Sequence, residues 1–356
     1  YSVGPKVDGD DNVAIGRAAA AILTGNYNVV MGSQAATVAT AMGSGVVIGR
    51  QAGLALSTAG QVGVIVGALA GSSLTDGTEN TLLGFYAGKN GNFNKSTIVG
   101  HKAGESNTAD YVTLVGWEAA KANTGDRTTA FGAYALKANT SGNQNVAMGY
   151  VSLYKNVHGD NNTAIGNAAL YNTEPADGEG DNTALGYYAG YGNTTGTGNV
   201  FIGKFAGYDQ TTDDDKLFID NSETATPLIG GDFSARTVTI DGTLSATAKS
   251  FNIEHPLDKD KRLVHGSLEG PEHGIYLRGS IEATGECLIE LPDYWEAMCD
   301  DYTVQLTPHG PYTVFIKEKQ KGKVMVECYT RRSSYKFDYY IVGARTDETL
   351  EVVQDA

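Results

Sequence analysis

The hydrophobic positions of residues 10–208 recur with a period of about 17 residues, which is neither a helical period nor a simple strand alternation. Each period holds a short apolar run that ends in glycine, as in "NNTAIGNAAL" at residues 161–170 and "DNTALGYYAG" at residues 181–190. Such a fixed period is typical of a repeat architecture. We take the twelve glycines as anchors of the repeat: Gly16, Gly32, Gly49, Gly67, Gly84, Gly100, Gly116, Gly132, Gly149, Gly166, Gly186 and Gly203.

When the repeats are aligned on the anchor glycine, four columns of the alignment vary little between copies. The residue three before it is Val or Thr in every copy, and the residue directly before it is always apolar. The residue three after it is Ala in eleven copies and Ser152 in the other, and Asn stands four before it in seven copies. Obligatory β-branching favours a strand. A glycine in every period, without a 3.6-residue stripe, argues against a helix.

Each repeat therefore predicts one coil of a β-solenoid, with two short strands and two turns. We expect Asn and Gly to form the turns, since both tolerate positive φ. The small residue after the anchor indicates close backbone approach. Coils that pair edge to edge at about 4.8 Å would give a rod of roughly 53 Å.

The predicted strand is apolar on both of its faces. Its first and third positions share one face, and the second position, such as Ile65 or Phe201, points the other way. The narrow lumen of one coil can cover a single face, so the other face should meet another chain. A parallel homotrimer is the natural closed arrangement. A wider, monomeric solenoid is the alternative.

The composition changes after the repeats. Residues 208–250 contain no further anchor and alternate polar clusters with short β runs, which indicates a connector or shaft. Residues 251–356 are richer in charge and hold six strand-like runs: "GIYLRGSIEA", "ECLIELP", "YTVQLTPHG", "YTVFIKE", "KVMVECYT" and "FDYYIVGART". Lys321-Gly322 marks a hairpin turn. The sequence thus divides into a repeat region at 1–207, a connector at 208–250 and a small antiparallel β-sandwich or barrel at 251–356.

Charge and composition narrow the function. The formal charge of −15 argues against a nucleic-acid binder and against docking on an anionic membrane. No apolar run approaches the length of a membrane span. Three cysteines without close spacing indicate neither a disulfide framework nor a zinc site. The first residue is Tyr1, from which we expect a processed or incomplete chain.

Candidate catalytic and metal-binding groups are few, and we expect no enzyme activity, no metal and no cofactor. Glu269 and Glu272 are the best carboxylate pair for glycoside cleavage, but their spacing suits a polar turn. The acidic run Asp213–Asp215 lacks the pattern of a calcium loop. Cys299 has no local nucleophile signature. The remaining candidates are histidines without metal-ligand spacing: His255, His265, His273 and His309.

Aromatic residues are the more useful clue to binding. They are dense in residues 251–356, and such rings offer a large contact area at low entropy cost. Filling of the small core is the competing explanation for each of them, and the one we favour. The candidates for receptor contact are Tyr294, Trp295, Tyr312 and Tyr335.

The repeats resemble the head repeats of trimeric autotransporter adhesins and the same repeats in phage tail fibres. The resemblance covers about residues 10–208 and rests on "NNTAIGNAAL" and "DNTALGYYAG". It implies a left-handed parallel β-roll that trimerises side by side. The period here is 16–20 residues, longer than in that family, so coil geometry should differ in detail.

The C-terminal part also resembles a domain found at the ends of phage tail fibres. The resemblance rests on "KSFNIEHP", "SLEGPEHGIYLRG", "ELPDYWE" and "LTPHG". Together, the two resemblances imply a trimeric tail fibre of a phage or phage-like particle, extracellular on the virion. Its expected partners are a host cell-surface glycan or protein and other fibre or baseplate proteins. A bacterial surface adhesin fragment, a purely structural spacer and, more remotely, a polysaccharide-cleaving spike are the alternatives.

Overall fold

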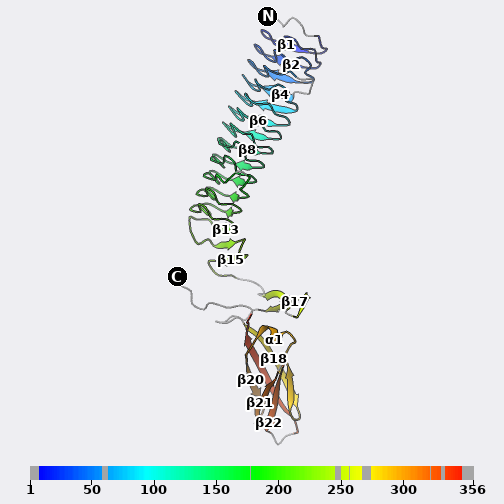
Figure 1. Cartoon of the computed structure of the whole chain (residues 1–356), viewed down its shortest axis with the longest axis vertical. Helices are drawn as coiled ribbons and strands as arrows, with labels where there is room; N and C mark the ends of the chain where they lie inside the picture. Colours follow the sequence, from blue (N-terminus) through cyan, green and yellow to red (C-terminus); the bar gives the residue numbers. More distant parts are fainter. Residues whose placement is uncertain are drawn as a thin grey trace. The chain divides into compact units, whose positions relative to one another are not determined.

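The computed structural model consists of two compact units, residues 1–244 and 245–356. The described residues are 8–57, 63–176, 178–244, 250–255, 257–266, 274–320, 322–329 and 333–346. Nearly all regular structure is β, as Figure 1 shows. The prediction of an all-β chain, with a parallel solenoid followed by a small antiparallel β domain, is confirmed.

The first unit is a rod of stacked coils (Figure 1). Each predicted repeat contributes one strand, and consecutive strands pair in parallel and in register, for example Thr163 with Thr183. The strands are β1 (Val13–Ile15), β2 (Val29–Met31), β3 (Val46–Ile48), β4 (Gly63–Val66), β5 (Asn80–Leu83), β6 (Thr97–Val99), β7 (Thr113–Val115), β8 (Thr129–Phe131), β9 (Val146–Met148), β10 (Thr163–Ile165), β11 (Thr183–Leu185) and β12 (Val200–Ile202).

The lumen of the rod is filled by small and apolar side chains. The residue two before each anchor glycine points inward, and Ile65, Leu114 and Phe201 at this position are fully buried. The alanines three residues after the anchors, such as Ala169, are also fully buried. Close packing across a narrow lumen explains why this column admits only Ala or Ser.

The anchor glycines stack directly on one another. Gly132 has φ +147°, and a Cβ atom there would lie 2.3 Å from the carbonyl oxygen of Gly149 in the next coil. The same relationship recurs between successive anchors along the rod. A side chain is therefore excluded both by the backbone angle and by the neighbouring coil.

The wall opposite the strands corrects the expected coil. In the described residues 8–208, this wall forms turns and holds no second strand. Left-handed backbone recurs two and four residues after the anchor, at residues as bulky as Val151 (φ 50°) and Leu136 (φ 51°). A strand cannot form where alternate residues adopt positive φ. Hydrogen bonds between coils persist there, as from the Leu136 amide to the Ser152 carbonyl at 3.0 Å.

The asparagines before the strands also differ from expectation. They are absent from the positive-φ positions, which belong to the residues just before them, such as Asp181 (φ 56°). Instead, Asn162, Asn182 and Asn199 are fully buried and hydrogen-bond from coil to coil. A second buried column, which the sequence analysis missed, stands seven residues after the anchors: Asn107, Asn123, Asn139, Asn156, Thr173 and Asn193.

The parallel stack extends one strand beyond residue 207. β13 (Lys216–Ile219) pairs in parallel with β12, and Asp220 takes the place of the anchor glycine beside Gly203. β14 (Ile229–Asp232) and β15 (Thr237–Ile240) then continue the sheet in antiparallel order. Part of the expected connector is thus the end of the rod.

The second unit is a sandwich of two three-stranded antiparallel sheets. One sheet has the order β18 (Gly274–Ala283), β23 (Tyr335–Ala344), β20 (Tyr302–Pro308), and the other β19 (Cys287–Glu290), β22 (Lys323–Tyr329), β21 (Thr313–Gln320). These six strands were expected, as was the hairpin that joins β21 to β22 through Gly322 (φ 69°). Two additions were not: the hairpin of β16 (Ser250–His255) and β17 (Asp258–Gly266), and the short helix α1 (Trp295–Met298).

The two sheets share one core. Phe337 and Ile341 come from the first sheet, Val324 and Val326 from the second, and all four are fully buried. Trp295 of α1 joins the same cluster with 1% exposure. Side chains on alternate positions of each strand point away from this core, so each sheet also presents an outer face.

Candidate functional site

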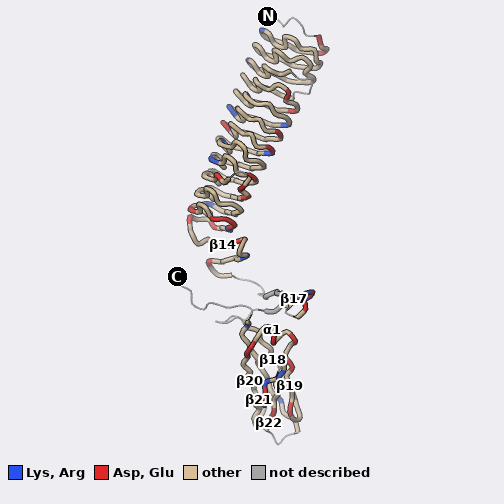
Figure 2. Tube along the Cα trace, in the orientation of Figure 1, with Lys and Arg blue, Asp and Glu red and all other residues tan. Residues whose placement is uncertain are grey.

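An exposed apolar stripe runs along the strand wall of the rod. The residues three and one before each anchor glycine form it, and they include Ile15 (52% exposed), Phe131 (53%) and Leu185 (48%). These two columns contain no charged residue, and Figure 2 shows most of the rod uncharged. Exposed apolar side chains continue into the end of the rod at Leu228 and Val238. A contiguous apolar stripe of this length is typical of a protein–protein interface.

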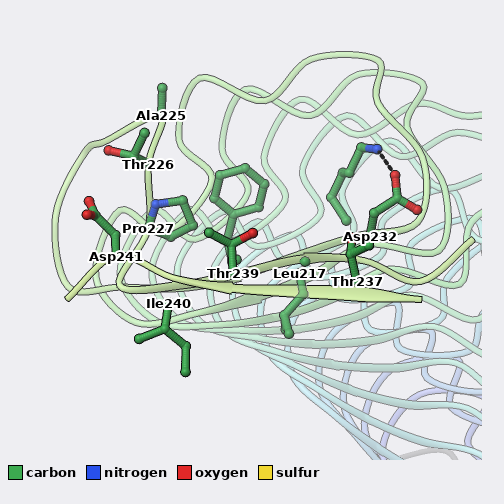
Figure 3. Close-up of a pocket in the computed structure, with 13 residues that line it drawn as sticks. Leu217, Ala225, Thr226, Pro227, Asp232, Thr237, Thr239, Ile240 and Asp241 are labelled. Atoms are coloured by element: carbon green, nitrogen blue, oxygen red, sulfur yellow. Dashed lines mark hydrogen bonds and ion pairs between the residues drawn. The ribbon is translucent and has the colours of Figure 1, made fainter. Parts of the chain in front are cut away.

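A cavity of about 530 Å³ opens where the rod ends (Figure 3). Phe218, Pro227, Gly230 and Gly231 are among the residues that line it. Lys216 and Asp232 also line this cavity and form an ion pair, with Nζ 2.5 Å from Oδ2, which Figure 3 draws as a dashed line. Hydrogen bonds from Lys216 and Ser234 lower the pKa of the Asp232 carboxyl. Both charges are therefore satisfied within the protein.

The four aromatic residues predicted for receptor contact do not form one exposed surface. Trp295 and Tyr335 are buried in the core, with 1% and 3% exposure. The Tyr312 hydroxyl donates to the carbonyl oxygen of Lys336 at 2.6 Å and accepts from its amide at 2.9 Å. Tyr294 packs edge to face with His255. The density of rings here serves core packing, which was the favoured explanation for each residue.

The outer face of the sheet β18-β23-β20 offers a better candidate. Arg278, Tyr340 and Gln305 lie side by side on neighbouring strands, because Tyr340 pairs with both of the others. These residues line a shallow hollow of about 390 Å³. The ring of Tyr276 lies 5.8 Å from that of Tyr340, and Tyr276 is 44% exposed. The face thus combines an exposed and a half-buried tyrosine ring with a cation and an amide, a mixture suited to recognition.

Asp338 is the second polar feature of this face. Its carboxylate accepts hydrogen bonds from the Ser280 hydroxyl and, at 2.9 Å, from Nε2 of His309. These bonds lower the pKa of Asp338, so the group is ionised at neutral pH. The carboxylate lies between Ser280 and His309, so the imidazole does not contact the hydroxyl as a general base must. The arrangement can accept hydrogen bonds from a ligand, and it lacks the order of a catalytic triad.

The other predicted groups form no reactive centre in the described part of the chain. Asp214 accepts hydrogen bonds from the Thr197 amide and hydroxyl, and no cluster of metal ligands occurs among the described residues. Burial raises the pKa of the thiols of Cys287 and Cys328, which makes both poor nucleophiles, and Cys299 is buried. Glu269, Glu272 and His273 lie outside the described residues, as does the side chain of His265.

Comparison of the chain with protein-family models, curated proteins and solved structures finds no match.

The candidate face was missed in the sequence, although a signal for it was present. In "GIYLRGSIEA", apolar residues alternate with Tyr276, Arg278 and Ser280, and in "FDYYIVGART" with Asp338 and Tyr340. Strand alternation places those residues on one face once the two segments are known to pair. The pairing itself could not be read from either segment alone.

Proposed function

We propose that the chain is the subunit of a homotrimeric fibre that attaches a phage or phage-like particle to a host cell surface. The observation that carries the proposal is the exposed apolar stripe of the rod. Ile15, Phe131 and Leu185 would remain in water in an isolated chain. Burial of such side chains is worth about 25 cal/mol for each Å² removed from water. Three parallel chains around an axis would cover all three stripes by the same contact.

The attachment role is proposed for the outer face of β18-β23-β20. Three copies in one fibre would gain avidity by multivalency, by about 10²–10⁴ over a single site. The polar hollow beside Arg278 and Tyr340 supports a cell-surface glycan or protein as the receptor. The resemblance of the repeats to adhesin heads and fibre proteins supports the same role.

Cell-binding measurements on the intact chain test this role. Labelled protein is applied to a panel of bacterial strains, and the doubly substituted variant Arg278→Ala/Tyr340→Ala is compared with the unchanged protein. We expect the double variant to lose binding, while Tyr329→Ala, which removes a 73% exposed ring from the other sheet, keeps it. Equal binding by all three proteins would contradict the assignment to this face. Failure of the unchanged protein to bind any strain would favour a structural spacer.

A bacterial surface adhesin is the second candidate, favoured by the same stripe and the same repeats. The two differ in where the protein resides: on a virion, with other fibre or baseplate proteins as neighbours, or on a bacterial surface. Among the described residues, no helix has the length and apolar character that crossing a membrane requires. Immunolabelling of purified particles and of intact cells separates the two candidates.

A further inference from the structure

Four tyrosines form a continuous stack along the last coils of the rod. Tyr154, Tyr171, Tyr191 and Tyr208 each stand five residues after an anchor glycine. Their ring centroids are separated by 5.1, 5.2 and 5.1 Å, and the angles between successive rings are 1°, 18° and 6°. We call this set the tyrosine ladder. Regular coil stacking has brought chemically identical side chains to a fixed spacing of one coil.

The tyrosine ladder lies on the wall opposite the apolar stripe. The residue before each ladder position faces the lumen: Leu153 and Leu170 are fully buried, and a Cβ atom on Gly190 would lie 2.5 Å from the Phe201 ring. Phe201 is the inward residue of β12, so this contact crosses the lumen. The ladder rings therefore emerge on the outside of the opposite wall, where a trimer built on the apolar stripe would leave them accessible.

The rings present their edges and hydroxyl groups to solvent. Their faces are occupied by the stacking, and all four residues are half-buried. In the described part of the chain, none of the four hydroxyls has a protein hydrogen-bond partner, and none is a buried atom. Burial, together with the neighbouring tyrosines, raises the pKa of Tyr171 and Tyr208. The row thus consists of neutral hydroxyls that can both donate and accept.

The surroundings of the ladder are aromatic, and the charges beside it are of both signs, with Lys137 near Tyr154 and Glu223 and Asp209 near Tyr208. The ring centroid of Tyr188 lies 4.9 Å from that of Tyr191, and the centroid of Phe205 lies 5.6 Å from that of Tyr208. Further aromatic rings therefore flank the ladder toward the end of the rod. Lys155 is near the ladder, with Nζ 5.6 Å from the Tyr171 centroid. Tyrosine offers a rigid apolar body with a polar tip, which suits recognition at an accessible surface.

We propose that the tyrosine ladder binds an extended, uncharged polysaccharide that lies along the rod. A row of equal groups with a repeat near 5 Å matches a linear polymer whose sugar units repeat on the same scale, because successive units then meet the same contacts. The tyrosine hydroxyls exchange hydrogen bonds with the hydroxyls of the sugars, and the exposed ring edges are covered from water by the bound chain. Several weak contacts on one chain reinforce each other. This site is independent of the receptor face proposed above.

Titration of the intact protein with neutral oligosaccharides tests the ladder. The probes are β-1,4-linked oligomers of N-acetylglucosamine and of glucose and α-1,6-linked mannan fragments, each with two to eight units, with oligogalacturonate as the charged comparison. Calorimetry should show affinity that rises with the number of units and then levels off for at least one neutral series. The Tyr171→Ala/Tyr191→Ala variant, which interrupts the row, should lower that affinity by about 10-fold or more.

Two further variants separate the contribution of the ladder from that of other exposed rings and of the hydroxyl groups. Tyr27→Ala removes a 63% exposed ring outside the ladder and should leave oligosaccharide affinity unchanged. Phe at all four ladder positions keeps the stack and tests the hydroxyl contribution, with circular dichroism confirming the fold. Absence of binding by every neutral series, affinity independent of length, or preference for oligogalacturonate would overturn the proposal. Cell binding through Arg278 and Tyr340 is measured separately, so failure of either site is distinguishable from failure of the other.

Discussion

The backbone amide of Asn199 donates a hydrogen bond to the side-chain oxygen of Asn182 in the preceding coil, at 3.0 Å. The side-chain amide of Asn182 in turn donates to the Asn162 oxygen at 3.1 Å and to the Gly196 carbonyl at 2.9 Å. All three asparagines are fully buried. A buried amide that joins one coil to the next holds the register along the rod, because a slip would leave several polar groups without partners.

Substitution of Asn182 by Leu should destabilise the rod. The variant leaves the buried amide of Asn199 without its acceptor, which costs about 1–3 kcal/mol per chain. Chemical denaturation followed by circular dichroism measures the loss. Asn167→Leu is the matched control, since no hydrogen bond to the Asn167 side chain occurs among the described residues, and its effect should be small. Equal losses in the two variants would contradict a role for the asparagine column.

Substitution of Gly132 by Ala tests the stacking of the anchors. The new Cβ would lie 2.3 Å from the Gly149 oxygen at a left-handed φ, so both strain and a backbone clash oppose it. We expect a loss of at least about 1–3 kcal/mol. Gly178→Ala, at φ +79° with open space around its Cβ, isolates the strain and should cost less. Thermal melts of the two variants give the comparison, and the reverse order would contradict the clash.

Trimerisation can be tested on the apolar stripe. Light scattering should give about three times the chain mass of 37.4 kDa. Leu185→Asp places a charge at a 48% exposed position of the stripe and should lower the mass, because an unpaired buried charge is costly. Lys155→Asp, on the opposite wall, should leave the trimer intact. A monodisperse monomer of the unchanged protein would refute the homotrimer.

Overpacking of the alanine column should be costly. Ala169 is fully buried, so Ala169→Leu forces extra volume into the lumen and should destabilise the chain by roughly 1–3 kcal/mol. Ala133→Leu, at a half-buried position just after an anchor, provides the comparison. Unchanged thermal stability of Ala169→Leu would show that the lumen has room for a larger side chain.

The rod should lose stability in acid partly through Glu118. Burial opposes ionisation of this carboxylate, but the hydrogen bond from Lys137 and the charges of Lys121, Lys137 and Lys102 outweigh it and lower the pKa. Stabilisation by an acid with a lowered pKa is present above the ordinary glutamate value of about 4.3 and is lost as the pH falls through the folded-state pKa. Melting temperatures should therefore fall more steeply over that range for the unchanged protein than for Glu118→Gln. Parallel curves would refute the contribution.

The solenoid was predictable because its constraints repeat. The same close approach between coils requires glycine at all twelve anchors, and the same narrow lumen requires a small residue at the inward alanine position of each coil. The opposite wall was not predictable, since left-handed backbone at Leu136 or Val151 arises from coil stacking and contradicts the local preference of those residues. The buried polar columns become visible in the sequence only when the repeats are aligned on their anchor glycines. The same alignment shows the tyrosine ladder, which stands five residues after each of the last four anchors.

In the C-terminal domain, local signals identified strands but could not identify partners. Ser280 and Asp338 are 58 residues apart in sequence and meet only because β18 pairs with β23. Strand pairing at such separation depends on the whole core, so the outer face formed by Arg278 and Tyr340 required the structure. Trp295 shows the converse, because ring density alone did not separate a core residue from a contact residue.

The change of strand direction at the end of the rod has a consequence for solubility. A stack of parallel coils exposes an unpaired edge that could recruit the first coil of another molecule, which is how cross-β filaments grow. β14 and β15 are joined only by residues 233–236, so β15 brings no second wall of turns like the one that hydrogen-bonds from coil to coil along the rod. The hairpin therefore removes half of the surface on which a further coil would stack, and this disfavours end-to-end polymerisation of rods.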